Sequence, residues 1–299
     1  MRTFRCACGA RIFFENQACL ACGRELGFLP ETLQITAIEP DAENTYRVAD
    51  DPNRYRKCAN YAEHGVCNWM VPAGDEQPLC LACRLNNVIP DLSDPESRER
   101  WAKVESAKRR LVYSLLRLGL PLVPKSDSAE NGVAFDIKTE IGDERVLTGH
   151  EDGRITLNAT EADPVTLEKA RVAMKERYRT LLGHFRHEIG HHFWDRLVRD
   201  TPHLEEFRRL FGDERADYGE ALQRHYASDT IVAGNDQFIS HYAGVHPWED
   251  WAETFAHYLH IVDTLETARN FNLTPSSITD AGDVEHDFGV LMDEWHGNV

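Results

Sequence analysis

Three residues at helical spacing give the clearest chemical signal in the sequence: His187 and His191, with Glu188 between them. Residues at i and i+4 lie on one face of an α-helix, so two imidazole nitrogens can bind one zinc ion at about 2.0 Å. Glu188 projects beside such an ion and can take a proton from a water molecule held there. The pattern predicts a zinc-dependent hydrolytic centre. His184 and His192 lie at other angles on the helix and are not expected to be ligands.

A catalytic zinc ion needs a third protein ligand and keeps one coordination position open. Candidates lie in the segment HPWEDWAETFAHYLH, which places Glu249, Glu253 and His257 on one helical face. We predict Glu249, in the first turn, as the third ligand, with His257 or Asp250 as competing assignments. Glu253 lies one turn further on and is expected to accept the free N–H of a ligand imidazole, which fixes the tautomer of that ring.

The cysteines indicate two further metal sites. All eight lie between Cys6 and Cys83, in a chain whose first twenty residues lack the apolar stretch of a secretory signal, which favours metal binding over disulfides. Four thiolates close the coordination shell of zinc, so such ions stabilise a small fold and do no catalysis. His64 is a competing ligand for the second of the two sites, whose cysteines are Cys58, Cys67, Cys80 and Cys83. We expect one structural zinc ion at Cys6, Cys8, Cys19 and Cys22, and a second at Cys58, Cys67, Cys80 and Cys83.

Composition restricts the class of protein. The 299 residues carry 33 Lys+Arg against 50 Asp+Glu, a formal net charge of −17. This charge disfavours nucleic acid and anionic membranes as partners, and no apolar run approaches the roughly 20 residues of a membrane span. Residues 1–90 carry 9 Lys+Arg and 11 Asp+Glu, so the cysteine-rich region is not basic either. We expect a cytoplasmic protein whose zinc ribbon contacts, if anything, another protein.

The elements that must position these residues fall into two predicted domains. A turn-rich stretch at 91–95 places the boundary near residue 92, giving a zinc-ribbon domain over 1–92 and a second domain, which carries the histidine pair, over 93–299. The second domain is expected to be mainly helical with a small antiparallel sheet, so the predicted fold class is α+β. Helices are predicted from Pro95 to Gly119, from Pro164 to about 199, over 203–211 and 214–227, and from Pro247 to about 269; strands are predicted over 133–141, 145–150 and 154–160.

The motif HEIGH, followed by a tyrosine and then E-x-x-A-E, resembles the gluzincin metallopeptidases, particularly lethal-factor-type sequences. That resemblance implies that Glu249 is the third zinc ligand and that Tyr242, seven residues earlier, steadies the oxyanion. The runs RTLLGHFRHEIGHHFWDRL and EDWAETFAHYLHIVDTLETA, behind a cysteine-rich start, are similar to bacterial zinc-binding metallopeptidases with an N-terminal zinc ribbon. This similarity covers nearly the whole chain.

The resemblance implies hydrolysis of peptide bonds with one catalytic and two structural zinc ions, and Glu188 as general base. A protein or peptide is the expected substrate, and the segment 154–160 is interpreted as an edge strand that could pair with an extended peptide. Two alternatives stay open. The chain could be a ribbon-based adaptor whose inactive peptidase fold only binds peptide, or a zinc hydrolase of a non-protein amide.

Overall fold

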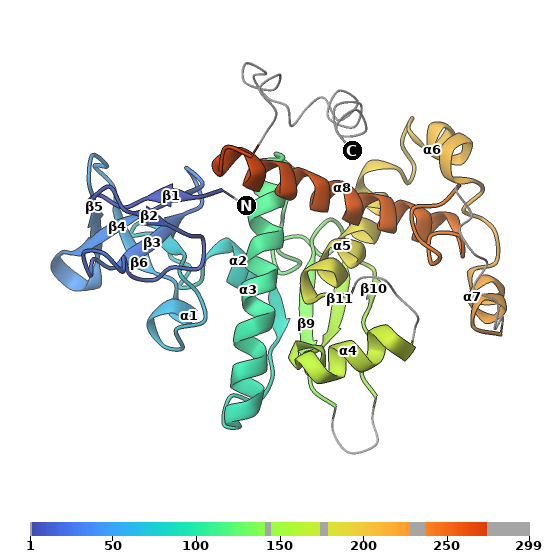
Figure 1. Cartoon of the computed structure of the whole chain (residues 1–299), viewed down its shortest axis with the longest axis horizontal. Helices are drawn as coiled ribbons and strands as arrows, with labels where there is room; N and C mark the ends of the chain where they lie inside the picture. The colour runs from blue at the N-terminus through green and yellow to red at the C-terminus, as the bar shows by residue number, and fades with distance from the viewer. Residues whose placement is uncertain (1, 141–144, 174–178, 228–236, 274–299) are drawn as a thin grey trace.

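A computed structural model describes residues 2–140, 145–173, 179–227 and 237–273. Short strands form the N-terminal part, one long helix runs through the middle of the molecule, and most of the remaining helices lie on its other side (Figure 1). This arrangement confirms the predicted α+β class, with an N-terminal cysteine-rich region and a mainly helical second part. No helix in the described ranges is both long and apolar enough to span a lipid bilayer.

The N-terminal part is built from antiparallel strands. A two-stranded hairpin precedes a five-stranded sheet with the order β3-β4-β5-β6-β7, and two one-turn helices flank its last strand. Both one-turn helices begin directly after a cysteine. The elements are β1 (Phe4–Arg5), β2 (Arg11–Ile12), β3 (Leu26–Leu29), β4 (Gln34–Pro40), the 3₁₀ turn η1 (Ala42–Asn44), β5 (Tyr46–Val48), β6 (Arg54–Lys57), α1 (Ala59–Ala62), β7 (Met70–Pro72) and α2 (Leu81–Arg84).

Helix α3 (Pro95–Arg117) joins the two parts of the molecule. The Asp94 side chain caps its N-terminus by accepting from the backbone N–H groups of Glu96 and Ser97, as a turn ending in Asp-Pro predicts. Its apolar side chains belong to one buried cluster that extends from the N-terminal strands into the helical part. On the N-terminal side, the guanidinium of Arg109 lies 2.8 Å from the carboxylate of Glu15. Helix α3 therefore contributes side chains to one hydrophobic core that both parts of the molecule share.

The small sheet differs from the predicted antiparallel one, because it is mixed. Its order is β10-β11-β9-β8, built from β8 (Asn86–Val88), β9 (Ala134–Lys138), β10 (Gly149–Glu151) and β11 (Arg154–Asn158). Strand β9 pairs in parallel with both β8 and β11, and only β10 pairs antiparallel. The prediction that 154–160 is an edge strand is also wrong: β11 lies between β10 and β9, and β10 is the edge.

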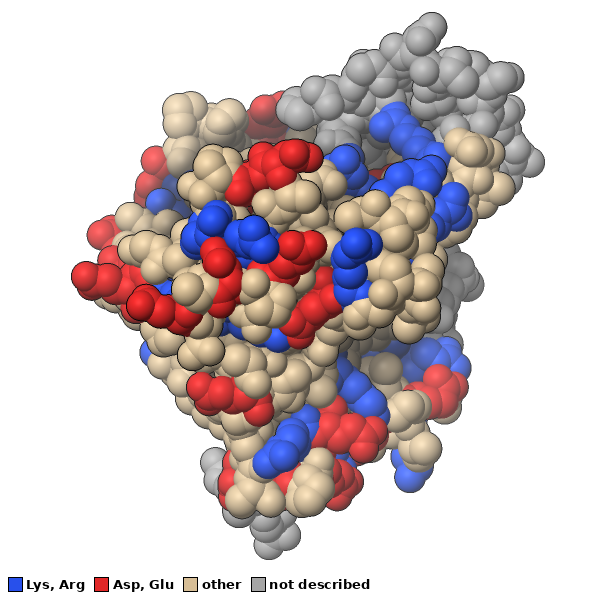
Figure 2. Space-filling view, turned by 90° about the vertical axis from the view of Figure 1, so that its left-hand side faces the viewer, with Lys and Arg blue, Asp and Glu red and all other residues tan. Residues whose placement is uncertain are grey.

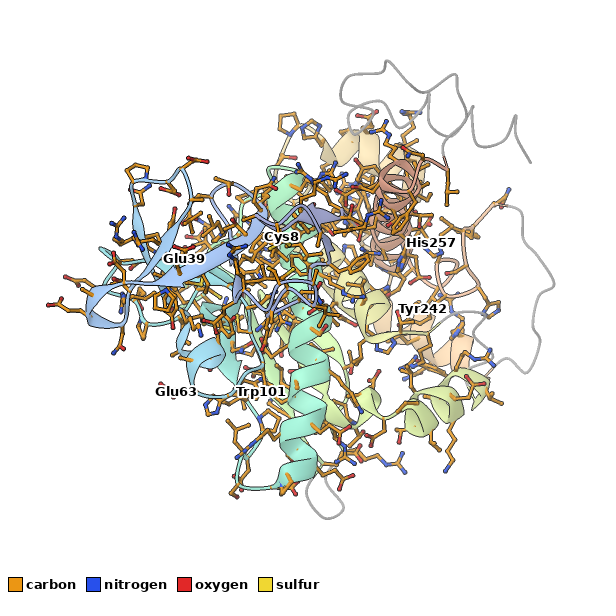
Figure 3. All side chains as sticks on the ribbon, turned by 60° about the vertical axis from the view of Figure 1, so that its left-hand side comes forward. Cys8, Glu39, Glu63, Trp101, Tyr242 and His257 are labelled. Atoms are coloured by element: carbon orange, nitrogen blue, oxygen red, sulfur yellow. The ribbon has the colours of Figure 1, made fainter. Side chains whose placement is uncertain are left out.

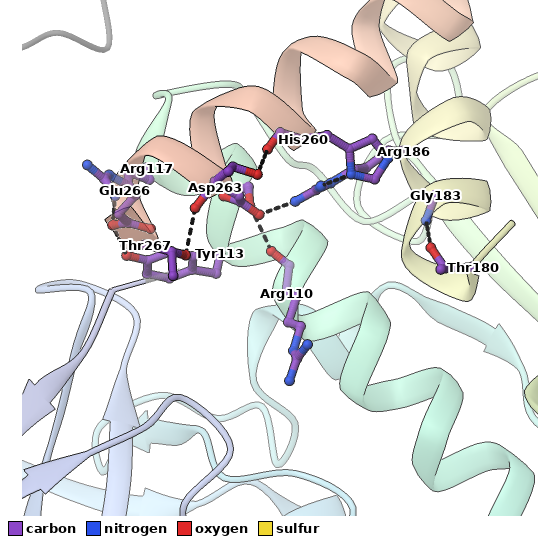
Figure 4. A network of polar contacts seen from close by, with 12 residues as sticks. Arg110, Tyr113, Arg117, Thr180, Gly183, Arg186, His260, Asp263, Glu266 and Thr267 are labelled. Carbon is purple, nitrogen blue, oxygen red and sulfur yellow. Dashed lines mark hydrogen bonds and ion pairs between the residues drawn. The ribbon is translucent and has the colours of Figure 1, made fainter. Parts of the chain in front are cut away.

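The helix predicted from 164 to 199 is two helices, α4 (Pro164–Ala173) and α5 (Leu181–Leu197), and the 3₁₀ turn η2 (Ala159–Ala162) precedes them. Thr180 has an extended backbone, and its hydroxyl accepts from the N–H of Gly183 at 3.0 Å, so α5 has its own N-cap (Figure 4). Three helices follow: α6 (Leu204–Phe211), α7 (Tyr218–Ala227) and α8 (Pro247–Asn270). The chain from 214 to 217, predicted as helix, forms a turn. The predicted second domain extends to residue 299, and its part after residue 273 lies outside the described residues.

A buried polar network ties α3, α5 and α8 together (Figure 4). Asp263 of α8 pairs with Arg186 of α5, and it accepts a hydrogen bond from the hydroxyl of Ser114 on α3 at 3.1 Å. His260 contacts the same guanidinium at 2.5 Å. Arg186 is only 2% exposed and directly precedes His187, so this network fixes the turn of α5 that begins the HEIGH motif.

Candidate metal centres

Helices α5 and α8 bring His187, His191 and Glu249 together. The Nε2 atoms of the two histidines are 3.2 Å apart. Oε2 of Glu249 lies 3.0 Å from Nε2 of His187 and 3.5 Å from Nε2 of His191. Ligand atoms that surround a tetrahedral zinc ion at 2.0–2.1 Å are about 3.3 Å from one another. The three atoms therefore fit three corners of a zinc tetrahedron.

The polarity of this group fits a cation. Glu249 is 1% exposed, and its Oε2 makes no hydrogen bond although it faces two ring nitrogens. Burial by itself raises the pKa of the Glu249 carboxyl, but the imidazoles of His187 and His191 hold that pKa well below its usual value. A buried carboxylate oxygen and two imidazole nitrogens that converge in this way are the donor set that zinc prefers.

Glu253 supports one of the two histidines. Its Oε1 lies 2.8 Å from Nδ1 of His187. A carboxylate only accepts, so Nδ1 carries the proton and the Nε2 lone pair of His187 points at the converging group. Burial raises the pKa of Glu253, but the contact with His187 lowers this pKa by more than burial raises it, so the net shift is downward. This carboxylate therefore fixes both the tautomer and the orientation of the ring.

Close packing between α5 and α8 sets these distances. Gly190 lies at the crossing, where a Cβ atom would stand 3.1 Å from Cα and 3.3 Å from the carbonyl oxygen of Ala252. The indole N–H of Trp251 donates to the carbonyl of Gly190 at 2.9 Å. The absence of a side chain at Gly190 allows the backbone of α8 to approach α5, and Glu249 comes within reach of both histidines.

Glu188 and Tyr242 lie around the same group. Glu188 directly follows His187 on α5 and is 9% exposed. The ring of Tyr242 lies 5.8 Å from the ring of His187, measured between centroids. Burial is the largest cause of a strongly raised pKa for Tyr242, so its phenol stays protonated at neutral pH and can donate a hydrogen bond.

Sequence reasoning missed Tyr218. Its hydroxyl, on α7, donates to Oε1 of Glu249 at 2.6 Å. The two residues are 31 positions apart on different helices, and neither motif nor periodicity relates them. The single signal was the presence of another tyrosine between the motif and α8.

The competing assignments for the third ligand lie outside the group formed by His187, His191 and Glu249. His257 makes a contact of 2.8 Å with the backbone carbonyl of Glu253, one turn earlier in α8. Burial raises the pKa of Asp250 to about 6, and this carboxyl does not join the cluster either. Of the other histidines in the motif helix, His184 lies 2.6 Å from Glu161.

The first four cysteines form a compact cluster in the N-terminal part, where Figure 3 labels Cys8. The Sγ atoms of Cys6 and Cys22 are 3.7 Å apart, as are those of Cys8 and Cys19. Thiolates that bind a tetrahedral zinc ion at 2.3 Å are about 3.8 Å apart, whereas a disulfide needs about 2.05 Å. Gly9, with φ of +86°, turns the backbone directly after Cys8, in a conformation that favours glycine. These thiols fit zinc.

The second cluster has the same geometry but lies deeper. Its four cysteines are all buried, and the Sγ atoms of Cys67 and Cys80 are 3.8 Å apart. The backbone N–H of Trp69 donates to Sγ of Cys67 at 3.4 Å, a contact that stabilises a thiolate. His64, the competing ligand, packs its ring against Trp101 instead, with 5.6 Å between centroids. The cluster consists of Cys58, Cys67, Cys80 and Cys83.

A cysteine-rich ribbon joined to a helical domain with a group of two histidines and one carboxylate defines a zinc-binding metallopeptidase architecture. The chain belongs to the family described as "Putative zinc-binding metallo-peptidase", whose profile matches residues 97–297. A zinc-ribbon domain profile matches residues 3–94. Both assignments confirm the predicted resemblance to zinc-binding metallopeptidases with an N-terminal zinc ribbon, while the gluzincin type and the division at residue 92 stay predictions.

Relatives in mycobacteria share this architecture in sequence. One protein of Mycobacterium bovis and two of Mycobacterium tuberculosis, from strains CDC 1551 and H37Rv, are each 42% identical to this chain over 299 residues. The similarity covers 99% of this chain and 84% of each relative, and all three bear the name uncharacterized protein. No solved structure matches the chain significantly.

Proposed function

We propose that this protein is a zinc-dependent peptidase of the gluzincin type, with His187, His191 and Glu249 as the zinc ligands. The observation that carries the proposal is the convergence of two histidine nitrogens and one buried carboxylate oxygen within 3.0–3.5 Å of one another. Among the described residues, no fourth histidine, cysteine or acidic side chain joins this group. Three protein ligands with one open position are typical of catalytic zinc sites, whereas structural sites have four.

A zinc ion held by these three residues would supply a Lewis acid at this place. Glu188 then accepts a proton from the attacking water and donates it to the leaving amine. Tyr242 donates its hydroxyl hydrogen to the oxygen on which negative charge develops, a contact typically worth about 2.7–4 kcal/mol. Glu253 keeps His187 in the tautomer that leaves Nε2 free for the metal.

An extended peptide or protein segment is the proposed substrate, and β10 is the strand that would bind it. Among the described residues, strand β10 is the edge of the mixed sheet, and its outer side pairs with no described strand. An edge strand can pair with an added strand through its backbone. His150 lies in this strand, and its ring stacks 6.1 Å from the ring of His191, measured between centroids. A peptide paired with β10 would pass beside His187, His191 and Glu249, which together form the metal group.

The test is Glu188→Gln, assayed on an unstructured protein substrate. We expect kcat/KM to fall by about 10²–10⁴-fold, the usual contribution of a general base, while the metal content stays the same. His257→Gln is the matched control, since His257 lies on α8 outside the ligand group. Retained cleavage in Glu188→Gln would remove this residue as the base. An inactive wild type that holds only two zinc ions would favour an adaptor that binds peptide, and cleavage of small amides alone would favour a non-protein substrate.

The proposed zinc content is one catalytic and two structural ions, and the proposed location is cytoplasmic, where a reducing environment keeps clustered thiols available for metal. The zinc ribbon is proposed to contact a protein and not nucleic acid. Figure 2 shows the side of the molecule that carries the ribbon, where acidic and basic side chains interleave, without one large basic patch on this face. Binding to nucleic acid needs such a basic surface.

A further inference from the structure

The two oxygens of the Glu249 carboxylate have different surroundings. Oε2 faces the two histidines, whereas Oε1 accepts a hydrogen bond from the hydroxyl of Tyr218 at 2.6 Å. Hydrogen bonds from a hydroxyl to a carboxylate are strong at 2.5–2.7 Å. Glu249 is 1% exposed, so water does not replace this donor if it is lost.

The ring of Tyr218 is held by residues at the beginning of α8. It packs edge-on against His246 at 5.2 Å and at a tilt against Trp248 at 5.9 Å, both measured between ring centroids. His246 is 3% exposed; its Nδ1 accepts from the N–H of Trp248, and its Nε2 donates to the carbonyl of Ala216 at 3.1 Å. The buried imidazole of His246 thus joins the first turn of α8, which carries Glu249, to Ala216, two residues before Tyr218.

We propose that Tyr218 is the residue that positions the Glu249 carboxylate for metal binding. A carboxylate can bind a metal through one oxygen or through both. Because Tyr218 occupies Oε1, Glu249 would offer Oε2 alone, and the position that its second oxygen would otherwise take would stay open for water. This inference rests on the proposed zinc site, and it concerns how the site is held and not which bond is cleaved.

The assignment gives Tyr218 and Tyr242 different roles. Tyr218 acts through a ligand, so its loss changes the affinity for metal even without a substrate. Tyr242 is proposed to meet the oxyanion, so its loss changes hydrolysis and leaves the metal affinity nearly the same. The loss of a residue with only a structural role would not change zinc affinity and peptide hydrolysis in this different way.

The experiment measures zinc affinity at the third site by competition with a chelator, in protein whose two cysteine clusters stay loaded. Tyr218→Phe is expected to bind this zinc ion about 10–100-fold more weakly, the usual effect of removing a group that supports a metal ligand. Tyr226→Phe, the same substitution on α7 at an exposed position, is the matched control and should bind as the wild type does. Tyr242→Phe should also keep its zinc affinity but lose peptide hydrolysis.

A double-mutant cycle with Glu249→Gln tests whether Tyr218 acts through Glu249. If the two residues were independent, the factor by which the double variant loses zinc affinity would equal the product of the two single factors to within about twofold. We expect it to be smaller than that product by more than this margin. Tyr218→Leu removes the donor with a different side chain and should reproduce the loss if Tyr218→Phe does not fold.

Wild-type affinity in Tyr218→Phe, or independent effects in the cycle, would overturn the assignment. A wild type that binds no third zinc ion would overturn both this assignment and the proposed function. A wild type that binds three but cleaves no peptide would overturn the peptidase alone, since the affinity measurement needs no substrate.

Discussion

Replacing Gly190 by alanine tests whether the close crossing of α5 and α8 holds the metal group together. The added Cβ would lie 3.1 Å from Cα of Ala252, whereas carbon atoms in ordinary contact are about 3.5–4.0 Å apart. The nearest atoms belong to backbone and cannot rotate away, so α8 must move by about 0.4 Å. Ala252 lies between Glu249 and Glu253, and both carboxylates would move with it.

The expected size of the effect follows from opposing contributions. Alanine in place of glycine favours the helix by about 1 kcal/mol, but extra volume in a packed interface typically costs about 1–3 kcal/mol. The net loss is therefore about 0–2 kcal/mol, or about 2–4 °C in Tm for each kcal/mol. Metal binding should suffer more, because a movement of about 0.4 Å exceeds the roughly 0.2 Å tolerance of a zinc–ligand distance.

The assay combines thermal unfolding with chelator competition at the third zinc site. We expect Gly190→Ala to release this zinc ion at least about tenfold more readily, while the two cysteine clusters keep theirs. Gly219→Ala, within α7, is the control, because its Cβ would meet nothing nearer than 3.4 Å. If Gly190→Ala melts higher than the wild type and binds zinc as tightly, the interface has slack and the reasoning from its distances is refuted.

Three further predictions concern stability. Asp263→Ala leaves the guanidinium of Arg186, 2% exposed, without its carboxylate, and should cost about 3–5 kcal/mol in urea unfolding; a loss below about 1 kcal/mol would contradict this. Burial, with the charge of Arg186, lowers the pKa of His260 to about 4, so the unfolded chain alone gains a proton below about pH 6.5. Stability should then fall by at most about 1.4 kcal/mol per pH unit between roughly pH 6.5 and 4, and His260→Gln, compared by unfolding at pH 7 and 5, should lose less than the wild type. Cys83→Ser, in the buried cluster, should prevent folding as followed by circular dichroism, whereas Cys22→Ser, at an exposed position, should keep the fold and lose one zinc ion; equal effects would argue against the difference in depth.

Local signals made the long helices and the placement of the two motif histidines predictable. Asp94 and His246 precede Pro95 and Pro247, and each of these pairs begins a helix where the sequence indicates. The spacing of His187 and His191 fixes their relative position because both lie on one helix. The N-cap at Thr180 was missed because apolar residues continue at helical spacing on both sides of the break.

Contacts between distant segments could not be predicted in the same way. Alternation of apolar residues is similar in parallel and antiparallel pairs, so the sequence did not reveal that β9 runs parallel to β11. Tyr218 reaches Glu249 because of how α7 packs against the beginning of α8, and no spacing in the sequence encodes that packing. The family resemblance directed attention to Tyr242 and left Tyr218 unnoticed.

Strand β8 has a consequence for how the chain can be divided. Residues 86–88 come before the predicted boundary, yet they form the outer strand of the sheet beside α5, paired with β9. A fragment that begins at residue 93 would leave β9 with an open backbone edge, and open edges promote aggregation. A shortened chain should therefore begin upstream of Asn86, and one that begins at or before Cys83 would carry part of the second cysteine cluster with it. Gene fusions and truncations that respect the two sequence profiles would cut through one folded unit.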